Sequence, residues 1–300
     1  MADVVERIQQ MTGRLRGGAR KVAELVVASP QEVALSPASR VAEILGISVS
    51  TVVRFATQLG YDGYPALRRE LQDLIRRNLD PAERLNDFAT GAQQARARDR
   101  SFQLDAENLA ATERGVVAKD FEAAVALLSE ARNIYVFGLR SSFAIAYTLA
   151  FLLNQTLGNA RLLDGGRGDL PDQLMAIGPG DVLVAISFPR YTRLVIDTMD
   201  MAAARDARLI AITDGPLSPL AARAEVVLKA RCSGTGFGIS TVAGFALVNA
   251  LVAEVAVKNQ PRAVELLARL ERTLRDSDML EFGPDSMAVD RPRGETAGGG

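Results

Sequence analysis

Along the first quarter of the chain, apolar positions recur at the spacing of helices, and no strand-like alternation appears in the first 77 residues. A helix that closes at Gly46 is followed by one that begins at Ser48 and closes at Gly60. Serine is favoured at the start of a helix and glycine just past its end, which sets these boundaries. A longer amphipathic helix is predicted from Pro65 onward. We therefore expect an all-helical unit here.

A different pattern begins beyond a polar stretch, residues 78–103, which is predicted to be a linker with partial helix. One amphipathic helix is predicted over 104–131. After it, short apolar runs alternate with helical segments. The runs that we predict to be strands are 133–138, 160–164, 181–188, 207–214 and 224–230. The helices among and after them are predicted over 141–156, 170–177, 192–206 and 240–259, with a short helical piece from Ser218.

Continuous apolar strands separated by helices are typical of a parallel sheet that is covered on both faces. The predicted fold class is thus α + α/β. It comprises an all-α domain over 1–77, a linker over 78–103, and a three-layer α/β/α domain with a five-stranded parallel sheet over 104–275. Residues 276–300, rich in Pro, Gly and Asp, are predicted to be a flexible tail.

Composition removes several function classes. The chain has no histidine and one cysteine, Cys232, so we expect no Cys/His metal site, no catalytic triad with histidine, no cofactor and no internal disulfide. A single cysteine fits a reducing cytoplasm. The start of the chain lacks a secretion signal, and the longest apolar run, 242–253, is too short to span a membrane. We expect a cytoplasmic protein with no membrane partner.

The segment 48–60 divides into two faces on a helical wheel. The apolar face, predicted to bury against Val41, Ile44 and Leu45, consists of Val52, Phe55, Ala56 and Leu59. The other face carries Ser50, Thr51, Arg54 and Gln58. Two helices joined by a short turn with glycine form a helix-turn-helix, whose second helix enters the major groove of DNA.

The residue types on this second helix suit DNA. Arg54 can bind guanine bidentately and Gln58 can pair with adenine, while hydroxyls and free N–H groups near Ser48 suit phosphates. Flanking phosphates could be held by Arg68, Arg69, Arg76 and Arg77. Residues 1–77 hold eleven Lys/Arg against eight Asp/Glu, a net +3. The alternative is a three-helix unit that only packs, with Ser and Thr as caps.

Two predicted strands end in residues suited to hold an anion. They are Arg140, Ser141 and Ser142 after the first strand, and Ser187, Arg190, Tyr191 and Thr192 after the third. Ligands of open α/β sheets lie outside the carboxyl ends of the strands, where helix N-termini hold anions. Hydroxyls and guanidinium groups suit a phosphate or carboxylate. In the alternative interpretation these serines are caps and the arginines are solvated.

The N-terminal pattern resembles the RpiR family of bacterial transcription regulators. The resemblance rests on "A-x-x-L-G-x-S-x-S-T-V-x-R-F", beginning at Ala42, and on "L-G-Y-x-G-Y-x-x-L-R", beginning at Leu59. It covers most of residues 14–77. It implies that Ser48, Ser50, Thr51 and Arg54 sit at DNA-contacting positions. The turn from Tyr61 to Tyr64 would support the helix that follows.

Residues 104–275 resemble the sugar isomerase (SIS) domain that follows the helix-turn-helix in this family, through "IYVFG-x-x-SS", "DVLVAIS" and "GFALVNALVAEVA". The resemblance implies a phosphorylated-sugar site at Ser141, Ser142, Ser187 and Thr192. This chain departs from the family pattern in three places. Arg140 stands where glycine is usual, and Pro189 and Arg190 replace the second serine and the glycine of S-x-S-G-x-T. The expected effector is therefore an anionic metabolite, either a sugar phosphate or a sugar acid.

Three functions stay open at this stage. The favoured one is a regulator, a homodimer or homotetramer, with helices 143–157 and 242–257 as candidate dimer surfaces. The alternative is a sugar-phosphate isomerase, which would need a carboxylate such as Glu225 or Glu254 because histidine is absent. In the third, the SIS-like domain only oligomerises. The loop 231–241 is predicted to close the ligand pocket, with Cys232 as inert filling or a thiol sensor.

Overall fold

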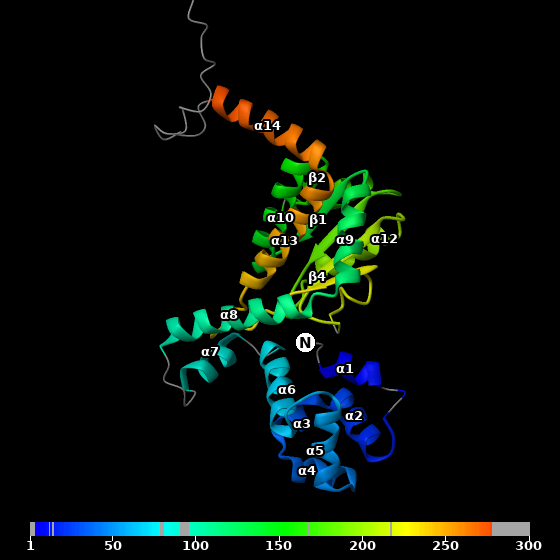
Figure 1. Ribbon diagram of the computed structural model, residues 1–300, viewed down its shortest axis with the longest axis vertical. Coiled ribbons are helices and arrows are strands. Elements are labelled where there is room, and N and C mark those ends of the chain that lie inside the picture. Colours follow the sequence, from blue (N-terminus) through cyan, green and yellow to red (C-terminus); the bar gives the residue numbers. More distant parts are fainter. Residues whose placement is uncertain are drawn as a thin grey trace, which may run out of the picture.

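The computed structural model describes residues 4–11, 13, 15–78, 81–90, 96–166, 168–216 and 218–277. Figure 1 shows a group of short helices at the N-terminal end and an α/β unit beyond it, with two further helices between them. The tail predicted over 276–300 lies almost wholly outside the described residues.

The N-terminal part is all-helical, as predicted. Its helices are α1 (Val4–Met11), α2 (Gly18–Ala28), α3 (Pro30–Leu35), α4 (Ala38–Leu45), α5 (Val49–Gln58) and α6 (Tyr64–Asn78). The predicted apolar face of α5 is confirmed, because Val52, Phe55 and Ala56 are fully buried. The prediction that Ile44 packs against this face is wrong, because Ile44 remains 36% exposed near the end of α4.

Tyr64 ties α6 to the end of α3. Its hydroxyl lies 2.9 Å from the carbonyl oxygen of Val33 and 2.8 Å from that of Ser36, so its hydrogen can be donated to either. Burial raises the pKa of Tyr64, although Arg68 opposes the shift, and the phenol therefore stays a neutral donor at physiological pH.

Replacing Tyr64 by phenylalanine is expected to lower the free energy of unfolding by about 1–2 kcal/mol, because buried carbonyls lose their donor while the packing of the ring is kept. Urea unfolding followed by circular dichroism measures the change. Thr273→Val, which removes an exposed hydroxyl on α14 and keeps the shape of the side chain, is the control and should leave the midpoint unchanged. Equal midpoints for both variants would show that the Tyr64 hydroxyl contributes nothing.

Three helices lead from the N-terminal part to the sheet: α7 (Pro81–Thr90), α8 (Ala97–Gly115) and α9 (Ala118–Glu130). Helix α7 lies in the stretch predicted to be a linker with partial helix. The prediction of one helix over 104–131 is wrong. Gly115 ends α8, and Val116 and Val117 are both extended. Glycine followed by two β-branched residues favours such a break.

The predicted five-stranded parallel sheet is confirmed. Its strands are β1 (Ile134–Gly138), β2 (Ala160–Leu162), β3 (Val182–Ile186), β4 (Arg208–Thr213) and β5 (Val226–Lys229). They are all parallel, in the order β2-β1-β3-β4-β5. The remaining helices are α10 (Ser141–Leu157), α11 (Leu170–Met175), α12 (Arg193–Ala203), α13 (Val242–Lys258) and α14 (Gln260–Asp276).

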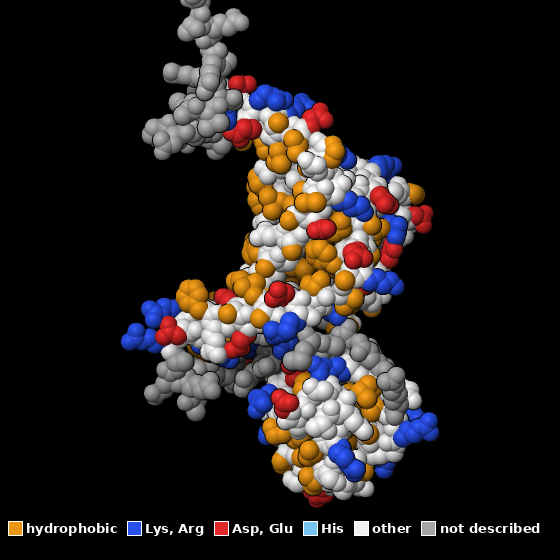
Figure 2. Space-filling view, viewed as in Figure 1, with side chains coloured by type: hydrophobic (Ala, Val, Ile, Leu, Met, Phe, Trp, Pro, Cys, Tyr) orange, Lys and Arg blue, Asp and Glu red, His pale blue; other side chains and the backbone are white. Residues whose placement is uncertain are grey.

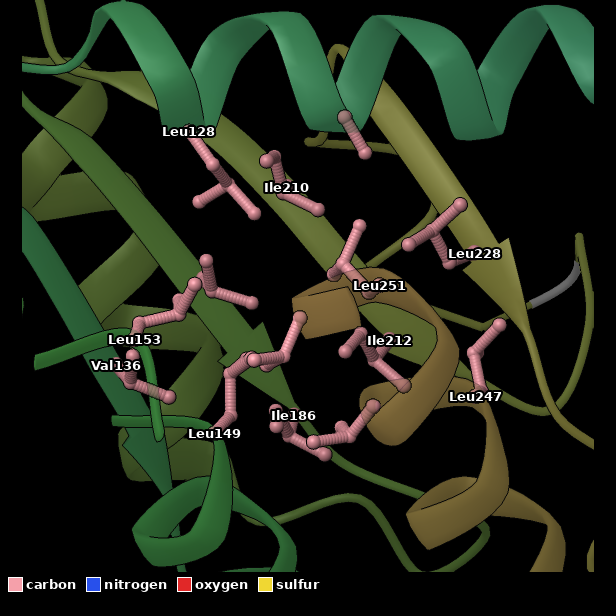
Figure 3. Close-up of a cluster of buried hydrophobic side chains, with 14 of the residues drawn as sticks. Leu128, Val136, Leu149, Leu153, Ile186, Ile210, Ile212, Leu228, Leu247 and Leu251 are labelled. Atoms are coloured by element: carbon pink, nitrogen blue, oxygen red, sulfur yellow. The ribbon is translucent and has the colours of Figure 1, made fainter. Parts of the chain in front are cut away.

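Alternation along each strand builds two hydrophobic layers. Ile134 and Val136 of β1 face a cluster with α9, α10 and α13, while Tyr135 and Phe137 face one with α11 and α12. Figure 3 shows leucines of the helices, among them Leu251, pointing toward isoleucines of the sheet. Because both faces of the sheet are covered, the central strands β1 and β3 are buried and apolar along their whole length. The fold is therefore the predicted three-layer α/β/α arrangement.

Two parts of the α/β unit differ from the sequence prediction. The short helix expected from Ser218 is wrong, because residues 218–223 form turns. Helix α14 was not predicted, although Pro261 near its start favours a helix N-terminus. Within the described residues no single helix has both the length and the apolar composition to cross a membrane. The pair α13 and α14 meets both together but is bent by 106°.

Candidate nucleic-acid interface and ligand site

A tight turn positions α5 against α4. Gly46 has φ 62°, a conformation that favours glycine, and its N–H donates to the Glu43 carbonyl at 3.2 Å. The N–H of Ile47 donates to the Ala42 carbonyl at 3.0 Å. These bonds satisfy the last carbonyls of α4 and let α5 begin at once. The two helices form the predicted helix-turn-helix.

Three hydroxyls gather at the N-terminus of α5. Ser48 is the N-cap, as predicted, and its Oγ accepts from the Thr51 N–H at 3.3 Å. The same oxygen lies 2.9 Å from Ser50 Oγ and 2.9 Å from Thr51 Oγ1. Ser50 is exposed, whereas Thr51 is half-buried, with its methyl group toward Gly18 of α2. A positive helix end lined by hydroxyls is suited to hold a phosphate.

The exposed face of α5 continues through Arg54 and Gln58, one turn apart. The Arg54 Nε donates to the Ser50 carbonyl at 3.3 Å, so the guanidinium lies along the helix beside the hydroxyls. Sequence reasoning missed two valines on this face, Val49 and Val53, which are 45% and 38% exposed. Their place on the helical wheel was the available signal. Apolar side chains in such a position can contact the methyl group of thymine.

The arginines of α6 differ in their surroundings. The Arg68 Nε donates to the Ala34 carbonyl at 2.9 Å and so joins α6 to α3, whereas Arg69 is exposed. The side chains of Arg76 and Arg77 lie outside the described residues. Figure 2 shows Lys and Arg side chains at the surface of the N-terminal helices. Arg69 is therefore better placed than Arg68 for a phosphate, because its side chain reaches solvent.

The predicted ligand residues lie at the carboxyl ends of two neighbouring strands. Gly138 of β1 pairs with Ile186 of β3, so the loops that follow them leave the same edge of the sheet. Gly138 also allows a close approach, because a Cβ there would lie 2.9 Å from the carbonyl oxygen of Ser142. The edge therefore brings together the start of α10 and the loop before α12.

Both arginines of this edge have strained backbones. Arg140 has φ 56° and ψ −127°, and Arg190 has φ 70°. Side chains other than glycine rarely adopt these values, which cost about 1–3 kcal/mol each. The two positions are those where the family pattern has glycine. Both side chains are exposed.

The serines and the threonine of this edge have local roles too. Ser141 is exposed, whereas Ser142 is buried. The Ser187 Oγ, also buried, accepts from the Thr192 N–H at 3.3 Å and closes the loop that carries Arg190. The alternative interpretation of these serines as helix caps is wrong, because α10 and α12 begin after Arg140 and Thr192 and neither start has a side-chain cap. Ser187 closes a loop instead, while Ser141 stays accessible.

Tyr191 points toward the end of β4. Its hydroxyl donates to Asp214 Oδ1 at 2.7 Å. Burial, followed by Asp214, raises the pKa of Tyr191 strongly, so the phenol stays protonated. Sequence reasoning missed Asp214, for which the only signal was its place directly after β4. Nearby, Thr213 Oγ1 donates to the Ser187 carbonyl at 2.8 Å. These bonds hold the loop after β3 against β4.

The carboxylates considered for isomerase chemistry lie elsewhere. Glu225 precedes β5, at the amino edge of the sheet, and pairs with Arg208, which lowers the pKa of Glu225. Glu254 is exposed on α13. Among the residues that the structure describes, no group of three or more His, Cys, Asp or Glu is placed to hold a metal ion.

A helix-turn-helix joined to a parallel α/β/α domain, with loops rich in serine and arginine at the carboxyl edge of its sheet, defines a class, the helix-turn-helix regulators with a SIS domain. Two family models match the chain. They are the helix-turn-helix domain of the rpiR family over residues 2–77 and the SIS domain over residues 127–256. The chain belongs to the RpiR family.

Individual proteins agree with this assignment. The transcriptional regulator HexR of Pseudomonas aeruginosa is 27% identical, over 76% of this chain and 79% of HexR. The sugar isomerase domain of an RpiR transcription factor from Sphaerobacter thermophilus is 34% identical, with a TM-score of 0.57, over 59% of this chain and 99% of that domain. Other curated relatives are named bifunctional protein glk, and the chain spans only 35% of their length.

A third relative supports the fold over both parts of the chain. Vibrio vulnificus NanR, solved in complex with ManNAc-6P, is 21% identical, with a TM-score of 0.55, over 91% of this chain and 98% of NanR. The predicted RpiR resemblance, with its helix-turn-helix and SIS domains, is thus confirmed.

Proposed function

We propose that this regulator binds an operator in double-stranded DNA through α5, and that an anionic metabolite at the carboxyl edge of the sheet changes its operator affinity. The observation that carries the proposal is the exposed face of α5. Ser50, Arg54 and Gln58 point outward while Phe55 anchors the helix in the core. Neither a cofactor nor catalysis is needed for this activity, which we place in the cytoplasm.

The protein would act as a homodimer or homotetramer. Two α5 helices related by a two-fold axis read half-sites about 34–36 Å apart, one helical turn of DNA. The exposed aromatic rings of α10, Phe143, Tyr147 and Phe151, stack on one another and are candidates for the surface between copies. The same proposal divides the chain into a DNA-binding domain over 1–77, a linker over 78–103, an effector-binding domain over 104–275 and a tail over 276–300.

The effector would be a sugar phosphate or a sugar acid. Ser141 and Thr192 offer hydroxyls, and Arg140 and Arg190 add guanidinium groups that bind carboxylate or phosphate bidentately. Relatedness to a SIS domain and the phosphorylated sugar bound by NanR support this class. The strain at both arginines also favours a binding role, since strained residues cluster at ligand sites.

Selection of bound fragments from genomic DNA tests the first half of the proposal and yields the operator. The operator dissociation constant is then measured with glucose 6-phosphate, N-acetylmannosamine 6-phosphate, gluconate and inorganic phosphate. A change with one of the organic anions supports the effector class. Failure to enrich any fragment would refute DNA binding, and turnover of a sugar phosphate above background would favour the isomerase alternative.

The double variant Ser187→Ala with Arg190→Ala is expected to bind the operator like the wild type but to lose the metabolite response. The reason is that both changes lie at the sheet edge and remove a loop bond and a guanidinium. Fluorescence anisotropy with and without the active anion measures both quantities. Arg193→Ala, which removes an exposed arginine on the next helix, is the control and should keep the response. A response retained by the double variant would move the ligand site elsewhere.

A further inference from the structure

The loop from Arg231 to Thr241, between β5 and α13, is held by α8. The side chain of Asn108 contacts the backbone of Ser233 twice: Nδ2 donates to its carbonyl at 2.6 Å, and Oδ1 accepts from its N–H at 3.2 Å. The N–H of Arg231 donates to Thr112 Oγ1 at 2.9 Å. Asn108 is almost fully buried, so its amide is committed to this loop.

The same loop is closed on itself. A Cβ at Gly234 would lie 2.4 Å from the carbonyl oxygen of Gly238, so glycine is required by the close approach of two backbone segments. Ser240 donates to Asp105, one turn from Asn108 on α8. Side-chain hydrogen bonds therefore join both ends of the loop to α8.

This loop also reaches the helix-turn-helix domain. The Arg231 guanidinium pairs with both carboxylate oxygens of Glu70 on α6, at 2.9 and 3.4 Å. The two side chains are only 24% and 22% exposed, so the pair is partly shielded from water. On α7, Arg84 donates to the Phe237 carbonyl. Helix α6 in turn packs through buried Leu67 and Leu71 into the cluster that holds α5.

The other end of this chain of contacts is the ligand edge. Ala230, next to Arg231, donates its N–H to the Thr213 carbonyl at 2.8 Å, and Thr213 Oγ1 donates to the Ser187 carbonyl at 2.8 Å. Ser187 begins the loop that carries Arg190. A shift of the loop after β3 would thus act through Thr213 on the backbone of Ala230 and so on the position of the Arg231 guanidinium.

We propose that the Arg231–Glu70 ion pair is the coupling contact through which the ligand edge of the SIS domain constrains the helix-turn-helix domain. The role in regulation rests on the proposed function, whereas the mechanical link does not. A contact between two sites is allosteric only if two states differ in it. The state with the pair formed holds α6, and with it α5, at one orientation to the sheet.

Amide hydrogen exchange of the full chain, without DNA or ligand, tests the mechanical link. Glu70→Gln and Arg231→Gln are each expected to raise exchange of residues 64–72 and 231–241 about tenfold, because the remaining charge is less compensated. The reversed pair, Glu70→Arg with Arg231→Glu, should restore protection in both segments. Glu271→Gln removes one carboxylate of an ion pair within α14 and is the control.

Unchanged exchange in residues 64–72, whether or not 231–241 responds, would overturn the coupling contact.

Operator binding supplies the second test, with the compound from the panel that changes the wild-type dissociation constant. In each single variant the operator dissociation constants with and without the compound should differ by a factor of about one, because equal constants mean that the two sites are not coupled. The reversed pair should regain the wild-type difference. Single variants with the full wild-type response would also overturn the contact. Wild-type protein that binds no DNA would refute the proposed function instead, while hydrogen exchange still decides on the ion pair.

Discussion

Arg54→Ala is expected to weaken discrimination between the operator and unrelated DNA by about 1–3 kcal/mol, the value of one bidentate contact between arginine and guanine. The physical reason is the position of the side chain. Arg54 is exposed on α5, beside the hydroxyls of Ser48 and Ser50, and its Nε already donates to the Ser50 carbonyl. Because the side chain is exposed, the N–H groups of the guanidinium that do not take part in this bond can meet a base edge.

Footprinting and competition with unrelated DNA at several salt concentrations measure this effect. Loss of a base contact should relax specificity at one position of each half-site, whereas loss of a phosphate contact would weaken all sequences alike. Arg272→Ala, which removes an exposed arginine on α14, is the control for charge and should change neither quantity. An unchanged footprint and unchanged competition in Arg54→Ala would refute the assigned role.

Asp181→Ala is expected to lower the free energy of unfolding by about 3 kcal/mol, because it removes a buried carboxylate on which several donors converge. Asp181 precedes β3 and its side chain is fully buried. It accepts from the Arg132 guanidinium at 2.9 and 2.6 Å and from the Gly178 N–H at 2.9 Å. The backbone and side-chain amides of Asn133 donate to it at 3.1 and 3.0 Å.

The pH dependence of this contribution has a definite sign. Burial alone would raise the pKa of Asp181, but the hydrogen bonds from Arg132, Asn133 and Gly178 outweigh it and hold the pKa below its ordinary value. A carboxyl whose pKa is lower in the folded state stabilises the fold above its unfolded pKa, about 3.9. That stabilisation is lost as the pH falls through the folded pKa. The difference between wild type and Asp181→Ala should therefore shrink progressively below about pH 4.

Denaturant unfolding between neutral and acidic pH measures both the size and the trend. Asp197→Ala is the matched control, because its carboxylate pairs with Arg193 at an exposed surface and should contribute at most about 1 kcal/mol. A loss in Asp181→Ala no larger than in the control would show that the bonds at Asp181 merely replace bonds to water. A difference that stays constant into acid would contradict the lowered pKa.

Local patterns were sufficient to predict the helix that is proposed to read DNA. Ser48 begins α5 and Gly46 ends α4 through hydrogen bonds between residues at most five positions apart. Such short-range preferences can be read directly from the sequence. The exposed polar face of α5 followed from its 3.6-residue period, since Phe55 had to be buried. The five strands were also readable, because a sheet covered on both faces needs mostly apolar side chains, which form short continuous runs in the sequence.

One prediction failed although a local signal was present. Gly115, Val116 and Val117 favour a break between two helices, but their apolar character was read as part of one helix. The role of Tyr191 was hidden because of distance along the chain, since its partner Asp214 lies 23 positions further on, directly after β4. The residues proposed to bind the ligand follow β1 and β3 at one edge of the sheet, as predicted, but their contacts depend on the loop after β3 meeting β4.

By itself the sequence determined the two domain types, the register of polar and apolar faces, and the chemistry available on each, because these properties arise from neighbours within a few turns or one strand. Only the tertiary structure decided which of these surfaces meet. Glu70 and Arg231 are 161 positions apart, and no local pattern pairs one carboxylate with one guanidinium among the 36 acidic and 35 basic residues of the chain. Their contact exists because packing of α8 against the loop after β5 brings that loop to α6.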